Sequence, residues 1–173
     1  MATSKRRNVL RGRAVVEPLD ARAARAAALD ALSRRDHSTE DLRRKLLEKG
    51  YDAAIVAPLV DGLRTEKLVD DGRYLENFVS YHAARGQGPL RVRAELRRHG
   101  LMGPSVEEYL DAYPDWMAHL RKARQKKFGA IPPNNYPDKQ RQARFLGYRG
   151  FTSAQIGTAL GSRFALDADT EDT

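Results

Sequence analysis

The sequence contains no cysteine, and this absence removes several classes of protein. Disulfide scaffolds, thiolate zinc sites, iron–sulfur clusters and cysteine nucleophiles all require the missing thiol. No run of about 18 apolar residues is present either, so no transmembrane helix is expected. The start of the chain is basic, but Arg11, Arg13 and Glu17 interrupt the apolar region that a signal peptide needs, so we expect a cytoplasmic protein.

Motifs of enzyme active sites are also lacking. The sequence has no phosphate-binding loop ending in Gly-Lys-Ser/Thr and no Gly-x-Ser-x-Gly elbow. Gly86-Gln87-Gly88 begins like a dinucleotide-binding loop, but it lacks the third glycine and follows a helix, so a turn is predicted. Asp70 and Asp71 stand beside Gly72, which favours a turn and a helix cap over a metal site. We therefore expect a binding protein without catalytic residues, metal or cofactor, rather than an enzyme. The histidines lack metal-ligand spacing, and each is predicted at the surface or in a loop: His37, His82, His99 and His119.

What the sequence does have is positive charge concentrated in one segment. The 173 residues are 41% hydrophobic and 31% charged, as in a globular chain, with a formal net charge of +8. Residues 21–115 carry equal numbers of basic and acidic side chains, whereas residues 116–166 carry ten basic side chains and one acidic residue, Asp138. Such a segment favours an anionic partner, either nucleic acid or an acidic protein surface, over a charge that merely keeps the chain soluble.

Apolar residues follow helical spacing throughout, and one helical pattern recurs at intervals of fifty residues. In each recurrence a glycine follows a leucine by four residues and precedes apolar residues by one, six and ten. The leucines and glycines are Leu46 and Gly50, Leu96 and Gly100, and Leu146 and Gly150. We therefore predict an all-α fold of three tandem three-helix units in an elongated curved array, with a glycine turn between the second and third helix of each unit. The predicted limits are a basic arm over 1–20, units over 21–69, 70–113 and 114–166, and an acidic tail over 167–173.

Local signals add detail to these units. Ser38 is expected to cap a helix whose inner side is formed by Leu42, Leu46 and Leu47. In the third unit a helix is predicted over residues 116–128, and a long loop over 131–137.

The third unit also presents the clearest candidate for a contact surface. Arg141, Arg144 and Tyr148 follow i, i+3, i+7 spacing opposite Leu146, and this face is expected to be free of acidic side chains. In the second unit Glu95 separates two arginines, so pairing within the helix and contact with a partner both stay open. In the first unit Glu48 partly neutralises Arg44 and Lys45, which favours an ordinary solvated face. The predicted partner-binding or nucleic-acid-binding residues are Arg91, Arg98, Arg121, Lys122, Arg124, Lys126, Lys127, Arg141, Arg144, Tyr148 and Arg149.

The helix–turn–helix outline of each unit suggests DNA readout as an alternative. Base readout requires the last helix of a unit to carry Arg, Asn or Gln toward the base edges. Only residues 152–162, with Gln155, fit that requirement. A stand-alone DNA-binding protein that acts through its third unit is therefore the alternative function.

Four stretches, taken in order, resemble the RecX family, bacterial proteins that modulate the recombinase RecA. They are Leu32-Ser-Arg-Arg-Asp-His-Ser-Thr-Glu-Asp-Leu42, Leu68-Val-Asp-Asp-Gly-Arg-Tyr74, Gly88-Pro-Leu-Arg-Val-Arg-Ala-Glu-Leu96 and Arg144-Phe-Leu-Gly-Tyr-Arg-Gly-Phe151. The resemblance implies a protein that lies in the groove of RecA filaments on single-stranded DNA and suppresses strand exchange, ATP hydrolysis and the coprotease activity of the SOS response. It also suits a monomer that has weak direct affinity for DNA and no membrane partner.

Overall fold

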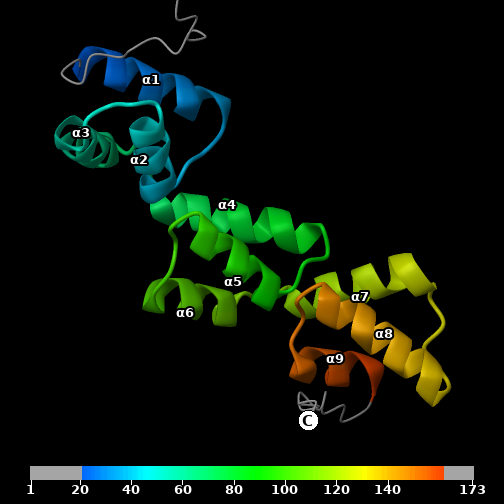
Figure 1. Ribbon diagram of the computed structural model, residues 1–173. Coiled ribbons are helices and arrows are strands. Elements are labelled where there is room, and N and C mark those ends of the chain that lie inside the picture. Colours follow the sequence, from blue (N-terminus) through cyan, green and yellow to red (C-terminus); the bar gives the residue numbers. More distant parts are fainter. Residues whose placement is uncertain (1–20, 162–173) are drawn as a thin grey trace, which may run out of the picture.

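Residues 21–161 are described by a computed structural model, and they form nine α-helices and no strand. The helices are α1 (Ala21–Arg34), α2 (Thr39–Glu48), α3 (Ala53–Thr65), α4 (Asp71–Ala84), α5 (Pro89–Arg98), α6 (Pro104–Ala112), α7 (Trp116–Phe128), α8 (Tyr136–Tyr148) and α9 (Ser153–Leu160). They form three groups of three that follow one another in an elongated array (Figure 1). We call these groups the first, second and third repeat. The predicted all-α repeat fold is confirmed; the predicted tails lie outside the described residues.

Side-chain caps begin the helices at the positions expected from the sequence. The Ser38 hydroxyl accepts a hydrogen bond from the Asp41 N–H at 3.1 Å, at the start of α2. The Asp70 carboxylate accepts one from the Arg73 N–H at 3.0 Å, at the start of α4. Each cap satisfies a backbone donor that the first turn of a helix leaves without a partner. Both predicted cap roles are therefore confirmed.

Helix α8 begins earlier than predicted. The Asn135 side chain accepts a hydrogen bond from the Asp138 N–H at 2.8 Å, so the helix starts at Tyr136. Pro137 therefore lies in the first turn of the helix rather than in a loop that runs over 131–137. Proline fits there because the first-turn N–H groups have no intrahelical acceptor in any case.

The repeated leucines occupy equivalent core positions. Leu46, Leu96 and Leu146 are each at most 1% exposed, and the glycine four residues after each has a positive φ. The apolar residues that follow these glycines by six and ten positions are also buried: Val56, Val60, Val106, Leu110, Ile156 and Leu160. The fifty-residue repeat is therefore a repeat of packing as well as of sequence.

Leu47 does not face the core as predicted, because it is 41% exposed. Consecutive residues of a helix are turned about 100° apart, so Leu47 lies well round α2 from Leu46. Leu42 and Leu46, one turn apart, are buried, and the core of the first repeat takes no third leucine from α2.

The four histidines lie in different settings. His37 lies in the loop between α1 and α2, which is one of the two predicted settings, but its side chain is fully buried. Its Nδ1 lies 2.6 Å from a carboxylate oxygen of Asp41, and that hydrogen bond explains how a polar ring is tolerated inside. His82, His99 and His119 are half-buried.

Arg44 is likewise not on an ordinary solvated face. Its guanidinium pairs with Asp41 and donates to the backbone carbonyl of Arg98 in the second repeat at 3.0 Å. The nearest Glu48 oxygen is 4.0 Å away. Arg44 therefore helps to join two repeats, and periodicity within one helix gives no sign of a contact 54 residues away.

The apolar core is divided unequally among the repeats. One cluster of buried residues belongs to the first repeat alone and includes Leu46. A second cluster is continuous through the second and third repeats and includes both Leu96 and Leu146. The second and third repeats therefore share a core, from which the core of the first repeat is separate.

We expect each of the substitutions Leu46→Ala, Leu96→Ala and Leu146→Ala to cost about 2–5 kcal/mol of unfolding free energy, because each removes a fully buried side chain. Hydrogen exchange measures how far the damage spreads. Leu46→Ala is expected to deprotect the first repeat only, whereas Leu96→Ala and Leu146→Ala are expected to deprotect both repeats that share a core. Loss of protection confined to the third repeat in Leu146→Ala would contradict this coupling.

Candidate functional site

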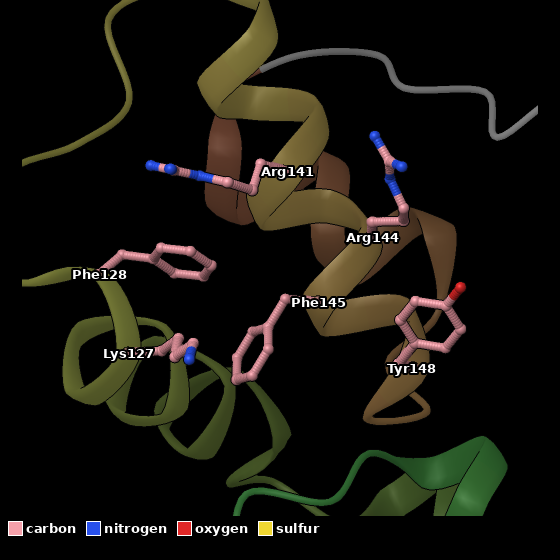
Figure 2. Close-up of a pocket in the computed structure, with 6 residues that line it drawn as sticks. All are labelled: Lys127, Phe128, Arg141, Arg144, Phe145 and Tyr148. Carbon is pink, nitrogen blue, oxygen red and sulfur yellow. The ribbon is translucent and has the colours of Figure 1, made fainter.

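A hollow of about 800 Å³ lies between the end of α7 and one face of α8. Figure 2 shows the six side chains that line it: Lys127, Phe128, Arg141, Arg144, Phe145 and Tyr148. We call this set the third-repeat groove. Three of its residues are cationic and three are aromatic, and no carboxylate lines it. The groove therefore offers charge and ring faces together.

Aromatic contacts hold the two helices of the groove against each other. The rings of Phe128 on α7 and Phe145 on α8 meet edge to face, with their centroids 5.3 Å apart. The Arg141 guanidinium lies over the Phe128 ring at 5.6 Å from its centroid, a cation–π contact. In Figure 2 both phenylalanines lie between the helices, whereas Arg144 and Tyr148 extend away from α8. Tyr148 is 79% exposed and is thus available to a partner.

The face formed by Arg141, Arg144 and Tyr148 is not free of acid, contrary to the prediction. Asp138 stands one turn before Arg141, and its carboxylate pairs with that guanidinium at 2.8 Å. The pair is exposed to solvent and is therefore weak. No ion pair of Arg144 or Lys127 occurs within residues 21–161, so these two cations carry the uncompensated charge of the groove.

A second hollow, of about 430 Å³, lies where the third repeat meets the second. Its cationic side chains come from the end of α4, from α7 and from the end of α8: Arg85, Lys122, Lys126, Lys127 and Arg149. It shares Lys127 and Phe145 with the third-repeat groove, so the two hollows border each other. We call this second hollow the junction pocket. The third-repeat groove and the junction pocket together form a cationic surface across α7 and α8.

Seven of the predicted binding residues line these two hollows: Lys122, Lys126, Lys127, Arg141, Arg144, Tyr148 and Arg149. Arg121 is exposed on α7 but lines neither hollow. Arg91 and Arg98 belong to α5, and Arg98 pairs with Glu95 at 3.2 Å, so the structure favours pairing within the helix for that arginine. The structure therefore gathers seven of the nine candidates of the third repeat and leaves Arg121, Arg124 and the two candidates of the second repeat outside the hollows.

Arg124 is turned toward its own chain rather than toward a partner. Its guanidinium donates to the backbone carbonyls of Gly129, Ala130 and Ile131 and to the side chain of Gln142. These bonds hold the loop between α7 and α8. The Arg124 guanidinium therefore stabilises this loop, a role that the spacing of residues along α7 does not reveal.

Arg149 both lines the junction pocket and supports it. Its guanidinium lies 5.2 Å from the centroid of the Phe145 ring and donates to the Arg85 carbonyl of the second repeat at 3.0 Å. Arg85 and Phe145 were not among the predicted site residues. Phe145 has a signal in the sequence, since it is an aromatic residue next to Arg144, but Arg85 reaches the site only through the packing of two repeats.

Gln155 is less suited to base readout than the sequence suggested. Its side-chain oxygen accepts a hydrogen bond from the Thr152 N–H at 3.0 Å, and the Thr152 hydroxyl accepts one from the Gln155 N–H at 3.2 Å. This capping box occupies Gln155 at the start of α9.

Neither a metal cluster nor a membrane span is found within residues 21–161. They contain no group of three or more His, Asp or Glu side chains that could hold a metal ion. None of the helices in this range is long and apolar enough to cross a membrane.

Comparison with known proteins links the three repeats to one family. Residues 24–63, 70–110 and 115–160 match, in order, the descriptions "RecX, first three-helix domain", "RecX, second three-helix domain" and "RecX, third three-helix domain". A relative from Halorhodospira halophila, named Regulatory protein RecX, is 42% identical over 86% of this chain and 91% of its own length. A relative of the same name from Pseudomonas entomophila is 38% identical over 84% of this chain and 94% of its own.

Solved structures show the same fold. The crystal structure of RecX from Lactobacillus salivarius superposes with a TM-score of 0.70 and covers 82% of this chain and 95% of that one. The identity is 19%, so this likeness concerns the fold.

Proposed function

The chain belongs to the RecX family, and from this membership we propose that it binds RecA nucleoprotein filaments and inhibits their recombinase, ATPase and coprotease activities. Its curated relatives are named regulatory proteins, which supports a regulatory role rather than an enzymatic one. As part of the same proposal, the protein acts as a cytoplasmic monomer that modulates DNA repair and the SOS response.

The observation that carries the proposal is the cationic, aromatic surface of the third repeat. A filament on single-stranded DNA presents phosphates, and Lys127 and Arg144 present charge that no carboxylate of residues 21–161 neutralises. Exposed Tyr148 adds a ring on the same helix as Arg144. The elongated array supports the proposal further, because a rod of three repeats offers an extended surface to a helical filament (Figure 1).

RecA-dependent ATP hydrolysis on single-stranded DNA, titrated with this protein, tests the proposal directly. We expect hydrolysis to fall at amounts stoichiometric with the filament or below, and RecA-mediated strand exchange to fall with it. Unchanged hydrolysis at stoichiometric amounts would remove the proposed function. Tight binding to DNA in the absence of RecA, without any effect on RecA, would instead favour the stand-alone DNA-binding protein.

A further inference from the structure

The two joints between repeats are built on one plan. The glycine turn of each later repeat presses against the first turn of the middle helix of the repeat before it: Gly100 against Glu40, and Gly150 against Arg91. A Cβ added to either glycine would overlap its neighbour's side chain. The carbonyl just before each glycine also accepts a hydrogen bond from the preceding repeat, at His99 and at Arg149. The joints therefore differ only in the groups that complete them.

Backbone bonds and a shared core complete the joint between the second and third repeats. The Gly88 N–H donates to the Arg149 carbonyl at 2.8 Å, and the Leu90 N–H donates to the Gly150 carbonyl at 2.9 Å. The apolar cluster of these two repeats is continuous. Backbone contacts of this kind restrict rotation of the third repeat relative to the second.

Side chains complete the joint between the first and second repeats. The Ser38 hydroxyl donates to the His99 carbonyl at 2.5 Å, and the Thr39 N–H donates to the Asp71 carboxylate at 2.7 Å. Arg44 adds the bond to the Arg98 carbonyl described above. The apolar core of the first repeat is separate from that of the others. This joint therefore depends on polar side chains rather than on a shared apolar core.

A buried carboxylate is the centre of this polar joint. The Asp41 side chain is 7% exposed, and it pairs with Arg35 at 3.2 Å, with Arg44 and with the ring of His37. His99 of the second repeat faces it, with Nδ1 3.7 Å from a carboxylate oxygen. Two guanidinium groups therefore already engage the Asp41 carboxylate beside the His37 ring.

The arrangement around His37 disfavours its protonated form. Nδ1 is engaged with Asp41, whereas Nε2 is buried and has no hydrogen-bond partner. A proton on Nε2 would be a buried donor without an acceptor, beside a carboxylate that two arginines already engage. Burial, supported by the charges of Arg35 and Lys45, lowers the pKa of His37 below its ordinary value against the opposing hydrogen bond and charge of Asp41. The charged or titratable groups of the cluster and its surroundings are Arg35, Asp36, Asp41, Arg44, Lys45, Asp71, Arg73, Tyr74 and His99.

We propose that the joint between the first and second repeats is an acid-released hinge, in which protonation of His37 loosens the first repeat from a rigid body formed by the second and third. The direction of the pH effect follows because the folded chain prefers the neutral His37 ring. The stability that the neutral ring gives to the joint is fully present above the unfolded pKa of histidine, about 6.5, and is lost as the pH falls through the lower pKa of the folded chain. The hinge would set the direction in which the first repeat points, whatever the chain binds.

Distance measurements between labelled repeats test the hinge, and the lack of native cysteine makes specific labelling simple. Ala57→Cys in α3 with Ala112→Cys in α6 reports on the first joint. Ala112→Cys with Gln125→Cys in α7 reports on the second. All three positions are exposed. Between about pH 7.5 and about pH 5 the 57–112 distance distribution is expected to shift and broaden, and the 112–125 distribution to stay constant. A constant 57–112 distribution, or equal changes in both pairs, would overturn the proposal.

The variant His37→Asn assigns the effect to one ring. Asparagine keeps an N–H near the place of Nδ1, but it does not titrate in this range. We expect this variant to lose the pH-dependent shift of the 57–112 pair; an undiminished shift would refute the hinge. In the unsubstituted chain, the NMR titration of the His37 Cε1–H must share its midpoint with the distance change. A different midpoint would overturn the proposal regardless of how well the variant folds.

Discussion

Replacing both Lys127 and Arg144 by glutamate is expected to weaken inhibition of RecA-dependent ATP hydrolysis about tenfold or more at low salt. These are the two groove cations that no carboxylate of residues 21–161 pairs with, so their charge is available to a filament. Arg141 is the poorer choice, because Asp138 already compensates it. Each cation removed from contact with a phosphate should lower by about one unit the slope of the logarithm of the binding constant against the logarithm of the salt concentration. The loss of inhibition should therefore become smaller as the salt concentration rises. Titrations at two ionic strengths measure both effects.

The matched control reverses two cations of the first repeat. Lys49→Glu with Arg64→Glu makes the same change of net charge at exposed positions far from the groove. The control is expected to retain most of the inhibition. Arg44 is unsuitable for this purpose, because it joins the first two repeats through Asp41 and the Arg98 carbonyl. Should the control prove more damaging than the groove variant, the anchor would lie on the first repeat. Circular dichroism must be unchanged in both.

Gly150→Ala is expected to destabilise the chain far more than Gly50→Ala, although the two glycines hold the same place in their repeats. Both have positive φ, +87° at Gly150 and +95° at Gly50, which costs an L-residue about 1–2 kcal/mol. A Cβ at Gly150 would also lie 2.5 Å from the Arg91 Cβ and 2.6 Å from the Arg91 backbone nitrogen. Forcing these atoms apart should add about 1–3 kcal/mol and weaken the joint between the second and third repeats.

The Gly50→Ala variant measures the cost of the positive φ alone, because nothing lies within 4 Å of the added Cβ. Chemical denaturation of the two variants gives the difference in unfolding free energy, and hydrogen exchange shows where protection falls. Gly150→Ala is expected to deprotect the α5 and α8 ends that meet at the joint, and Gly50→Ala only its own turn. Equal losses of stability would show that the close approach of Gly150 to Arg91 contributes nothing.

Local rules in the sequence determined the helices, the caps and the threefold repeat. Leu46, Leu96 and Leu146 could be assigned to the core because apolar residues at helical spacing lie on one face of a helix of 3.6 residues per turn, and that face packs inward. Ser38 and Asp70 could be assigned as caps because the unsatisfied N–H groups lie within three residues of them. The basic character of residues 116–166 is likewise a property of the sequence, since charge composition does not depend on packing.

Only the tertiary structure decided which charges are available and which are used within the chain. Arg124 and Gln155 have suitable positions on their helices, but nearby carbonyls and a capping box engage them. Arg44 belongs to the joint with the second repeat because it donates to the Arg98 carbonyl, and His37 is buried beside the Asp41 that Arg44 pairs with. Arg85 enters the junction pocket from another repeat. The physical reason is the same in each case. Helical periodicity gives the direction of a side chain relative to its own axis, whereas its protonation and partners depend on groups that folding brings from tens of residues away.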